Sequence, residues 1–143
     1  MTQSIDPRMP YYKMLVLTSH PENIIRIQPF LESICKDCEV CEEVFGNILV
    51  SITEAVTNAI LHGNNGDESK KVEIRMERQG NNRIGFFIKD EGAGFNPKKI
   101  PDPTSPENLL KIGGRGVYLM RQLSDKISFH DNGRIVEIDF NLK

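Results

Sequence analysis

The chain has 143 residues, of which 38% are apolar, and a formal net charge of -2. This length and composition predict a single domain, residues 1–143, built on one core. The near-balanced charge, with Lys and Arg residues scattered along the chain, gives no electrostatic footprint for DNA, RNA or an anionic membrane. We therefore expect no direct nucleic-acid ligand.

The N-terminal residues 1–10 lack the basic and then apolar layout of a secretory signal, and we expect them to be flexible. No apolar run in the sequence approaches the roughly 18 residues that a membrane span needs. The sequence therefore predicts a cytoplasmic protein that does not cross a membrane.

The first half of the chain predicts one strand and two helices. A dense apolar run predicts a strand over Tyr12–Thr18, and the helical spacing of apolar residues predicts a helix over Ile24–Ile34. Pro29 falls inside that spacing and predicts a kink or a late helix start. A longer helix is predicted over Val44–His62, with Gly63 just past its end.

The second half of the chain predicts four strands and one helix. Alternation of apolar and polar residues marks the strands, which are separated by turn-forming clusters at 79–82 and 131–133. A helix is predicted over Gly114–Leu123. The predicted strands are Val72–Met76, Ile84–Ile88, Lys126–His130 and Ile135–Leu142.

This order of elements predicts an α+β two-layer sandwich. The half-polar alternation of the strands is typical of a sheet with one buried and one wet face. We expect a mostly antiparallel sheet with the helices gathered on its buried face.

Three cysteines, Cys35, Cys38 and Cys41, form a Cys-x-x-Cys-x-x-Cys run. A structural zinc ion or an iron-sulfur cluster normally takes four protein ligands, and Phe45 occupies the position where ferredoxin spacing would place the fourth. We interpret the run as reduced thiols that pack a helix junction. A metal site completed by ligands from elsewhere in the sequence is the alternative.

The longer helix carries a polar stripe with one charged residue, Glu54. At 3.6 residues per turn, Glu54, Asn58 and His62 share one face, and Asn47 and Ser51 extend it one turn back. A solvent face would be built of Lys, Arg and Glu, whereas this face consists of amides, a hydroxyl, an imidazole and one carboxylate. The stripe therefore predicts the wall of a site.

Two glycine clusters occur at the boundaries of predicted secondary-structure elements. Asp-Glu-Gly-Ala-Gly at 90–94 directly follows a predicted strand, so a carboxylate would be fixed beside two backbone positions without side chains. An ordinary turn is the alternative. Gly-Gly-Arg-Gly at 113–116 opens the last predicted helix, where backbone N–H groups and the helix dipole could hold an anion. This second cluster is neither a Walker A loop nor a Rossmann fingerprint.

The three motifs, in this order, resemble the N, G1 and G2 boxes of the GHKL ATPase superfamily, which includes gyrase and the histidine kinases. They are Glu-x3-Asn-x3-His-Gly at 54–63, Asp-x-Gly-x-Gly at 90–94 and Gly-x-Gly at 114–116. Residues 51–63 look most similar to the bacterial anti-sigma-factor serine kinases of this superfamily. The resemblance covers nearly the whole chain and implies the GHKL, or Bergerat, ATP-binding fold.

The first two motifs would then bind the Mg2+ ion and the adenine ring of ATP. The resemblance implies that Asn58 holds the Mg2+ that bridges the ATP phosphates, an oxygen ligand suited to a hard cation. Asp90 would accept a hydrogen bond from the adenine amino group. Gly92 and Gly94 would let the backbone approach the nucleotide.

The third motif and the segment before it would bind the phosphates. The resemblance implies that residues 95–112 form an ATP lid and that Gly114 and Gly116 present N–H groups to the phosphates. Arg115 would either add a charge contact there or remain in solvent.

Glu54 decides the predicted chemistry, because one carboxylate beside the phosphate can orient and deprotonate an attacking hydroxyl. Histidine kinases usually carry His at this position and need a dimerisation helix pair, and gyrase-like members need transducer domains. We expect neither addition in this chain. The resemblance therefore implies a serine/threonine-protein kinase that uses ATP and Mg2+, with Glu54 as the catalytic base.

The resemblance also implies the partners. The kinase would phosphorylate an anti-sigma-factor antagonist and, as an anti-sigma factor, sequester a sigma factor. A non-catalytic ATP-binding switch module that only holds its partner is the alternative, and a domain that binds no nucleotide is a third interpretation. A homodimer, common among related kinases, stays open because the sequence identifies no dimer surface.

Overall fold

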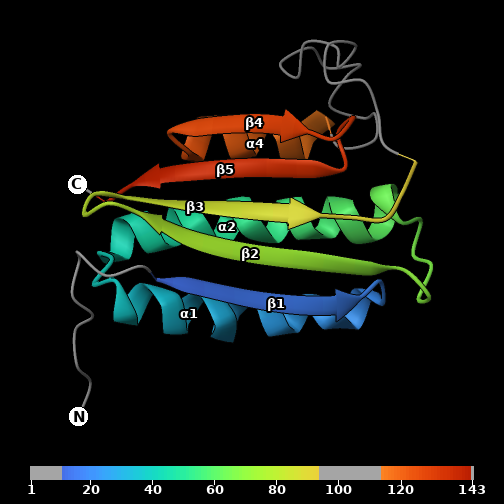
Figure 1. Ribbon diagram of the computed structural model, residues 1–143, viewed down its shortest axis with the longest axis horizontal. Coiled ribbons are helices and arrows are strands. Elements are labelled where there is room, and N and C mark those ends of the chain that lie inside the picture. Colours follow the sequence, from blue (N-terminus) through green and yellow to red (C-terminus); the bar gives the residue numbers. More distant parts are fainter. Residues whose placement is uncertain (1–10, 94–113, 143) are drawn as a thin grey trace.

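The computed structural model describes residues 11–93 and 114–142, the side chains of 114–118 excepted, and shows a sheet covered by helices on one face (Figure 1). The strands are β1 (Tyr12–Thr18), β2 (Lys71–Gln79), β3 (Arg83–Lys89), β4 (Lys126–His130) and β5 (Ile135–Asn141). The helices are η1 (Pro21–Arg26), α1 (Ile27–Asp37), α2 (Glu42–Asn58), η2 (Ala59–Gly63) and α4 (Gly114–Leu123). η1 is a 3-10 helix and η2 is a π turn that continues α2.

The five strands form one sheet in the order β1-β2-β3-β5-β4. Each of the four pairings between them is antiparallel. In this register Met76 of β2 lies opposite Phe86 of β3, which lies opposite Ile138 of β5. These three facing positions of the central strands are apolar and buried, as period-2 alternation with one buried face requires. The predicted α+β sandwich is therefore confirmed.

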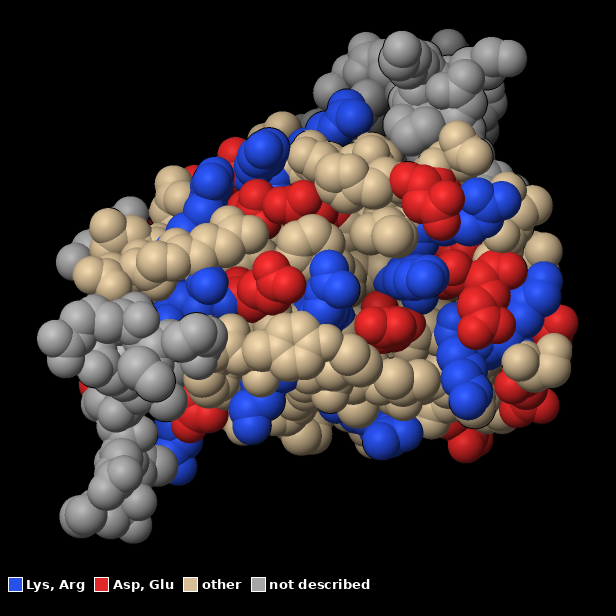
Figure 2. All heavy atoms as spheres, in the orientation of Figure 1, with Lys and Arg blue, Asp and Glu red and all other residues tan. Residues whose placement is uncertain are grey.

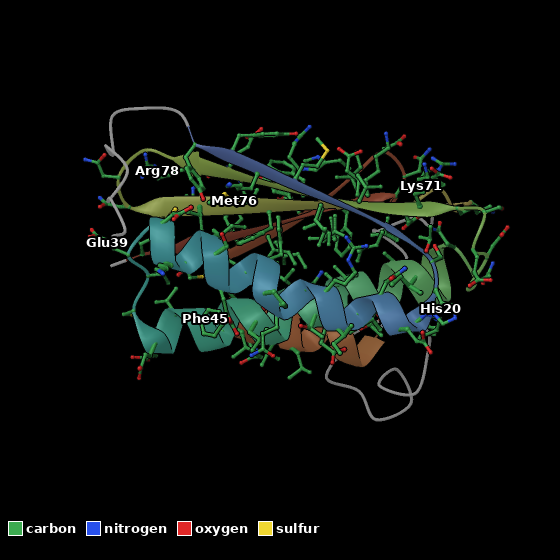
Figure 3. The ribbon with its side chains drawn as sticks, turned by 90° about the horizontal axis from the view of Figure 1, so that it is seen from below. His20, Glu39, Phe45, Lys71, Met76 and Arg78 are labelled. Carbon is green, nitrogen blue, oxygen red and sulfur yellow. The ribbon has the colours of Figure 1, made fainter. Side chains whose placement is uncertain are left out.

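The core lies between the sheet and the helices. Figure 3 shows the two layers edge-on, with Met76 on the sheet and Phe45 on α2. Phe86 and Phe140 are buried neighbours whose rings meet edge to face, with centroids 6.0 Å apart. Such a pair adds to the burial of apolar area that stabilises the fold. The largest buried aliphatic side chains are Leu17, Ile27, Leu31, Ile34, Ile48, Ile52, Ile60, Ile74 and Ile84.

The predicted effect of Pro29 is a late helix start rather than a kink. The chain first forms η1, whose N-terminus is capped by His20, with the imidazole Nδ1 accepting from the Glu22 N–H at 3.1 Å. The α-helix proper begins at Ile27, so Pro29 lies in its first turn. Proline is tolerated there because the first N–H groups of a helix have no intrahelical partner.

The cysteine run lies at the junction of α1 and α2. Cys35 is buried on α1, Cys38 is half-buried just after the helix, and Cys41 is exposed at the N-cap of α2. Burial raises the pKa of the Cys35 thiol to about 12, so this thiol stays protonated and packs as a small apolar group. Within residues 11–93 and 119–142, no three His, Cys, Asp or Glu side chains are grouped to hold a metal ion.

Together α2 and η2, Glu42–Gly63, are long and apolar enough to cross a membrane by length and composition, since an 18-residue window within them has a mean hydropathy of 1.5. The expectation that no apolar run is that long was therefore wrong. Packing accounts for part of this composition, although Val50 and Leu61 of the same segment are exposed. Ile48, Ile52 and Val56 of this helix are fully buried in the core. A core helix covered on several sides carries an apolar surface wider than one stripe.

The face of the sheet opposite the helices carries interspersed basic and acidic side chains, as Figure 2 shows, while its edge strand β1 exposes the apolar residues Tyr12, Met14 and Val16 there. Asp139 of β5 lies on this face yet is only 2% exposed. Burial, followed by the neighbouring Glu137 carboxyl, raises the pKa of Asp139 to about 6, while Arg83 and Lys126 lower it. Asp139 Oδ1 has no hydrogen-bond partner among the described residues.

Asp139→Asn is expected to stabilise the fold at pH 7.5 and to have little effect near pH 4. The pKa of the Asp139 carboxyl is higher in the folded protein than its ordinary value of 3.8. The stabilisation of the fold by the protonated carboxyl is therefore complete below pH 3.8 and is lost as the pH rises through about 6. Asparagine removes the buried charge, and we expect a gain of about 1 kcal/mol at pH 7.5. Urea unfolding at both pH values measures it. The gain should shrink in a Glu137→Gln background, and an equal effect at both pH values would contradict the explanation.

Candidate functional site

The three predicted motifs gather at one end of the molecule. In Figure 1 the end of α2, the end of β3 and the start of α4 all lie toward the right. α2 and α4 also pack against each other beneath the sheet. The fold therefore places the end of α2, the end of β3 and the start of α4 at the same end of the molecule.

Glu54 and Asn58 occupy the last turns of α2, and both side chains are half-buried. Neither has a hydrogen-bond or ion-pair partner among the residues that the structure describes. Ser51, one turn earlier, is fully buried, whereas Asn47 at the start of the predicted stripe is half-buried like Glu54. A carboxylate and an amide oxygen one turn apart, both without partners in the described part of the chain, form a suitable wall for a ligand and a hard cation.

The α-helix ends at Asn58 rather than at the predicted His62, because a π turn over Ala59–Gly63 follows. In this turn the Asn64 N–H donates to the Ala59 carbonyl at 2.8 Å. The wider turn rotates the exposed His62 relative to its place on an α-helix, so the prediction of one shared face holds only through Asn58. π turns inside helices occur frequently at functional sites.

Gly63 is required by space rather than by a left-handed backbone. A Cβ on Gly63 would lie 2.5 Å from Asp90 Oδ2 and 2.6 Å from Asp90 Cγ. The end of the helix therefore packs directly against the Asp90 carboxylate. This contact gives a structural role to Gly63 of the His-Gly pair, which the sequence could not explain.

Asp90 lies directly after β3 and is 9% exposed. Its N–H donates to the Arg134 carbonyl at 3.0 Å, and its Oδ1 accepts from the Gly92 N–H at 2.8 Å. Burial raises the pKa of Asp90, against the lowering effects of the Gly92 N–H, Arg134 and Lys70. The carboxylate is thus held by its own turn, and its Oδ2 faces Gly63.

Gly92 makes an even closer approach than Gly63. A Cβ there would lie 1.9 Å from the Gly63 carbonyl oxygen and 3.0 Å from Asp90 Oδ1. The sequence interpretation gave this glycine the task of admitting a nucleotide. The structure adds a reason that needs no ligand, because the turn after β3 and the end of η2 are in backbone contact here.

Asn64 joins these segments from inside the protein and is fully buried. Its amide nitrogen donates to Ser19 Oγ at 2.8 Å and to the Lys71 carbonyl at 3.0 Å. Its side-chain oxygen accepts from the Glu91 N–H at 2.8 Å. One side chain therefore ties the end of β1 and the start of β2 to the turn that carries Asp90.

Arg134, the residue directly before β5, also holds this turn. Its Nε donates to the Gly92 carbonyl at 2.9 Å, and its Nη2 donates to the Ala93 carbonyl at 3.0 Å. Its Nη1 lies 3.5 Å from Asp131 Oδ1. Neither Arg134 nor Asn64 belongs to a motif, and the sequence interpretation missed both. The Asn64-Asn65-Gly66 string looks like an ordinary turn, and Arg134 has no local signal because its partners lie 41 and 42 positions away.

The remaining predicted residues are placed less completely. Gly114 and Gly116 lie in the first turn of α4, as predicted. The side chain of Arg115, the residue Gly94 and the predicted lid at 95–112 lie outside the described part of the chain.

Comparisons with known proteins agree with this fold. A family model described as a histidine kinase-like ATPase domain matches residues 17–140. A protein named serine-protein kinase RsbW from Oceanobacillus iheyensis is 30% identical over 95 residues, which cover 62% of this chain and 60% of that kinase. Proteins of the same name from Bacillus licheniformis and Bacillus subtilis are 28% identical over 113 residues and 25% identical over 130 residues. These two alignments cover 75% and 87% of this chain and 70% and 81% of the relatives. Because the family model spans most of its length, the chain belongs to the family of histidine kinase-like ATPase domains.

Proposed function

We propose that the protein is an ATP-dependent serine/threonine kinase that acts on a partner protein in the cytoplasm. The observation that carries the proposal is the pair on α2, Glu54 and Asn58. Both side chains are half-buried and lack partners among the described residues, one turn apart, at the end of the fold where Asp90 also lies. The family and the kinase names of the relatives support the same activity.

Each matched residue has a proposed task in binding Mg-ATP. Asp90 accepts a hydrogen bond from the adenine amino group through Oδ2, because Oδ1 already accepts from the Gly92 N–H. Gly114 and Gly116 present backbone N–H groups at the start of α4, where the positive end of the helix dipole favours phosphate. Bound Mg2+ would neutralise charge on the phosphate oxygens, with the Asn58 side-chain oxygen as its protein ligand.

Three further residues complete the proposed phosphate and base contacts. Gly94 gives the backbone access to the nucleotide, and Arg115 adds charge beside the phosphates. Residues 95–112 form the lid that covers them. These tasks rest on the match of the motifs to the family pattern.

Glu54 is the proposed catalytic base. The hydroxyl oxygen of a Ser or Thr on the partner attacks the γ-phosphorus of ATP, and the bond from that phosphorus to the β,γ-bridging oxygen breaks. ADP leaves with the electron pair, and the hydroxyl proton passes to the Glu54 carboxylate. The protein mainly positions the groups and stabilises charge in such a transfer.

The proposed partners are those of anti-sigma-factor kinases. The substrate is an anti-sigma-factor antagonist, and the protein also sequesters a sigma factor. The test is incubation with ATP labelled at the γ-phosphate and the antagonist encoded nearest to this gene. Label on a Ser or Thr of the antagonist supports the kinase. Bound ATP with an unlabelled antagonist would favour the non-catalytic switch module instead.

Asp90→Asn is expected to reduce the preference for ATP over GTP by about tenfold, roughly the free energy of one hydrogen bond. A carboxylate only accepts hydrogen bonds, whereas an amide can also donate to the guanine carbonyl. Competition binding of the two nucleotides measures the ratio. Glu91→Gln is the matched control, since Glu91 is the adjacent, exposed carboxylate. An unaltered ratio in Asp90→Asn would mean that Asp90 only shapes the turn.

A further inference from the structure

We infer that Arg134 is a positioning residue for nucleotide binding, which fixes the turn that carries Asp90 without touching the nucleotide itself. This inference rests on the proposed function for its link to ATP. Arg134 lies in the turn between β4 and β5, whereas Asp90 directly follows β3.

Arg134 reaches the turn both before and after the Asp90 side chain. Its backbone carbonyl accepts from the Asp90 N–H at 3.0 Å, and its guanidinium donates to the Gly92 and Ala93 carbonyls at 2.9 and 3.0 Å. Two parallel donors from one rigid fork fix direction as well as distance. A turn held at both ends by one residue has little freedom to rotate its carboxylate.

The rest of the turn is held from within. The Glu91 N–H donates to Asn64, and the Gly92 N–H donates to Asp90 itself. The N–H groups of residues 90–92 and the carbonyls of Gly92 and Ala93 therefore all have hydrogen-bond partners. Within residues 11–93 and 119–142, only Arg134 donates to these two carbonyls, so its loss would release the outer half of the turn.

The side chain of Arg134 is 31% exposed, and this partial burial strengthens its hydrogen bonds. Asp131 Oδ1 lies 3.5 Å from Nη1 and gives the guanidinium an acidic neighbour. Arg134 also lowers the pKa of Asp90, whose net shift remains upward because of burial. The arginine thus favours the ionised carboxylate that can accept from an amino group.

The experiment compares the full chain with Arg134→Ala and Arg134→Lys. Arg134→Ala is expected to raise the dissociation constants of ATP and ADP about tenfold, by losing two charge-assisted hydrogen bonds. The turnover number at saturating ATP should stay within about twofold, because the groups at the phosphate end are untouched. Arg134→Lys keeps the charge but lacks the fork, so it should recover only part of the affinity.

Two control variants separate positioning from charge. Asp131→Asn removes the ion pair on Nη1 but leaves both bonds to the turn, and Asn tolerates the positive φ of 50° at this position. Arg75→Gln removes one positive charge from the open face of the sheet. Both are expected to bind ATP as the unaltered protein does.

A second readout does not depend on nucleotide at all. Hydrogen exchange should be faster at the Glu91 and Gly92 amides of Arg134→Ala, while the amides of β3 keep their protection. Unchanged exchange at these amides, or ATP affinity within twofold of the unaltered protein, would overturn the inference. Absence of phosphotransfer with the expected exchange and affinity changes would instead contradict the proposed kinase and leave the role of Arg134 supported.

Discussion

Glu54→Gln is expected to lower phosphotransfer to the partner by roughly 100-fold to 10,000-fold, the usual contribution of a positioned general base. Glutamine keeps the size and a hydrogen-bonding oxygen but cannot take the hydroxyl proton. Because Asn58 and Asp90 remain in place, the affinity for Mg-ATP should change by no more than about twofold. Single-turnover transfer and calorimetric titration measure the two quantities separately.

Two further variants define what that result means. Glu43→Gln alters an exposed carboxylate in the first turn of the same helix and should leave transfer unchanged. Asn58→Ala should weaken Mg-dependent binding itself. If Glu54→Gln abolished ATP binding instead, Glu54 would be a nucleotide or metal ligand and not the base.

Gly92→Ala is the second change with a large expected effect. Its methyl group would lie 1.9 Å from the Gly63 carbonyl oxygen, a backbone atom fixed in the π turn. One of the two segments must move, and overpacking of this kind typically costs about 1 to 3 kcal/mol or more. We expect the free energy of unfolding to fall by at least that amount and ATP binding to be lost with the displaced turn. Urea unfolding and calorimetry test both.

Gly46→Ala is the matched control. Gly46 lies within the same long helix segment as the π turn, and a Cβ there would have nothing within 4 Å. Alanine is favoured over glycine inside a helix, so this change should stabilise the protein by roughly 0.5 to 1 kcal/mol. If Gly92→Ala were as stable as Gly46→Ala, the close contact between the turn and η2 could not exist in solution.

Much of this fold could be predicted because short-range sequence patterns determine its strands and helices. The alternation of apolar and polar residues over β2 and β3 predicted which face of each strand is buried. The spacing of apolar residues along α2 predicted its buried side. Predicted boundaries differ from the structure by a few residues, as at Glu42, where α2 begins two positions early. The polar face at Glu54 and Asn58 was visible because its residue types are unusual for a solvent surface.

The parts that could not be predicted depend on long-range contacts. No local pattern distinguishes a π turn from an α-helix over Ala59–Gly63, because the turn is selected by what packs against its end. Gly63 and Gly92 look like two separate turn glycines, yet each is required by the other segment. Arg134 is an ordinary polar residue in sequence, and only the sheet order places it beside Ala93.

The sheet order also has a consequence for how the protein folds. Two pairings, β2 with β3 and β4 with β5, are local hairpins, whereas β1 with β2 and β3 with β5 join distant segments. Local pairings close short loops and are expected to form early. The Asp90 turn is held by bonds across 27 and 42 positions, and Asn64 reaches Ser19 across 45. The proposed nucleotide site would therefore assemble last, and we expect a chain that had formed only its two hairpins to bind no ATP.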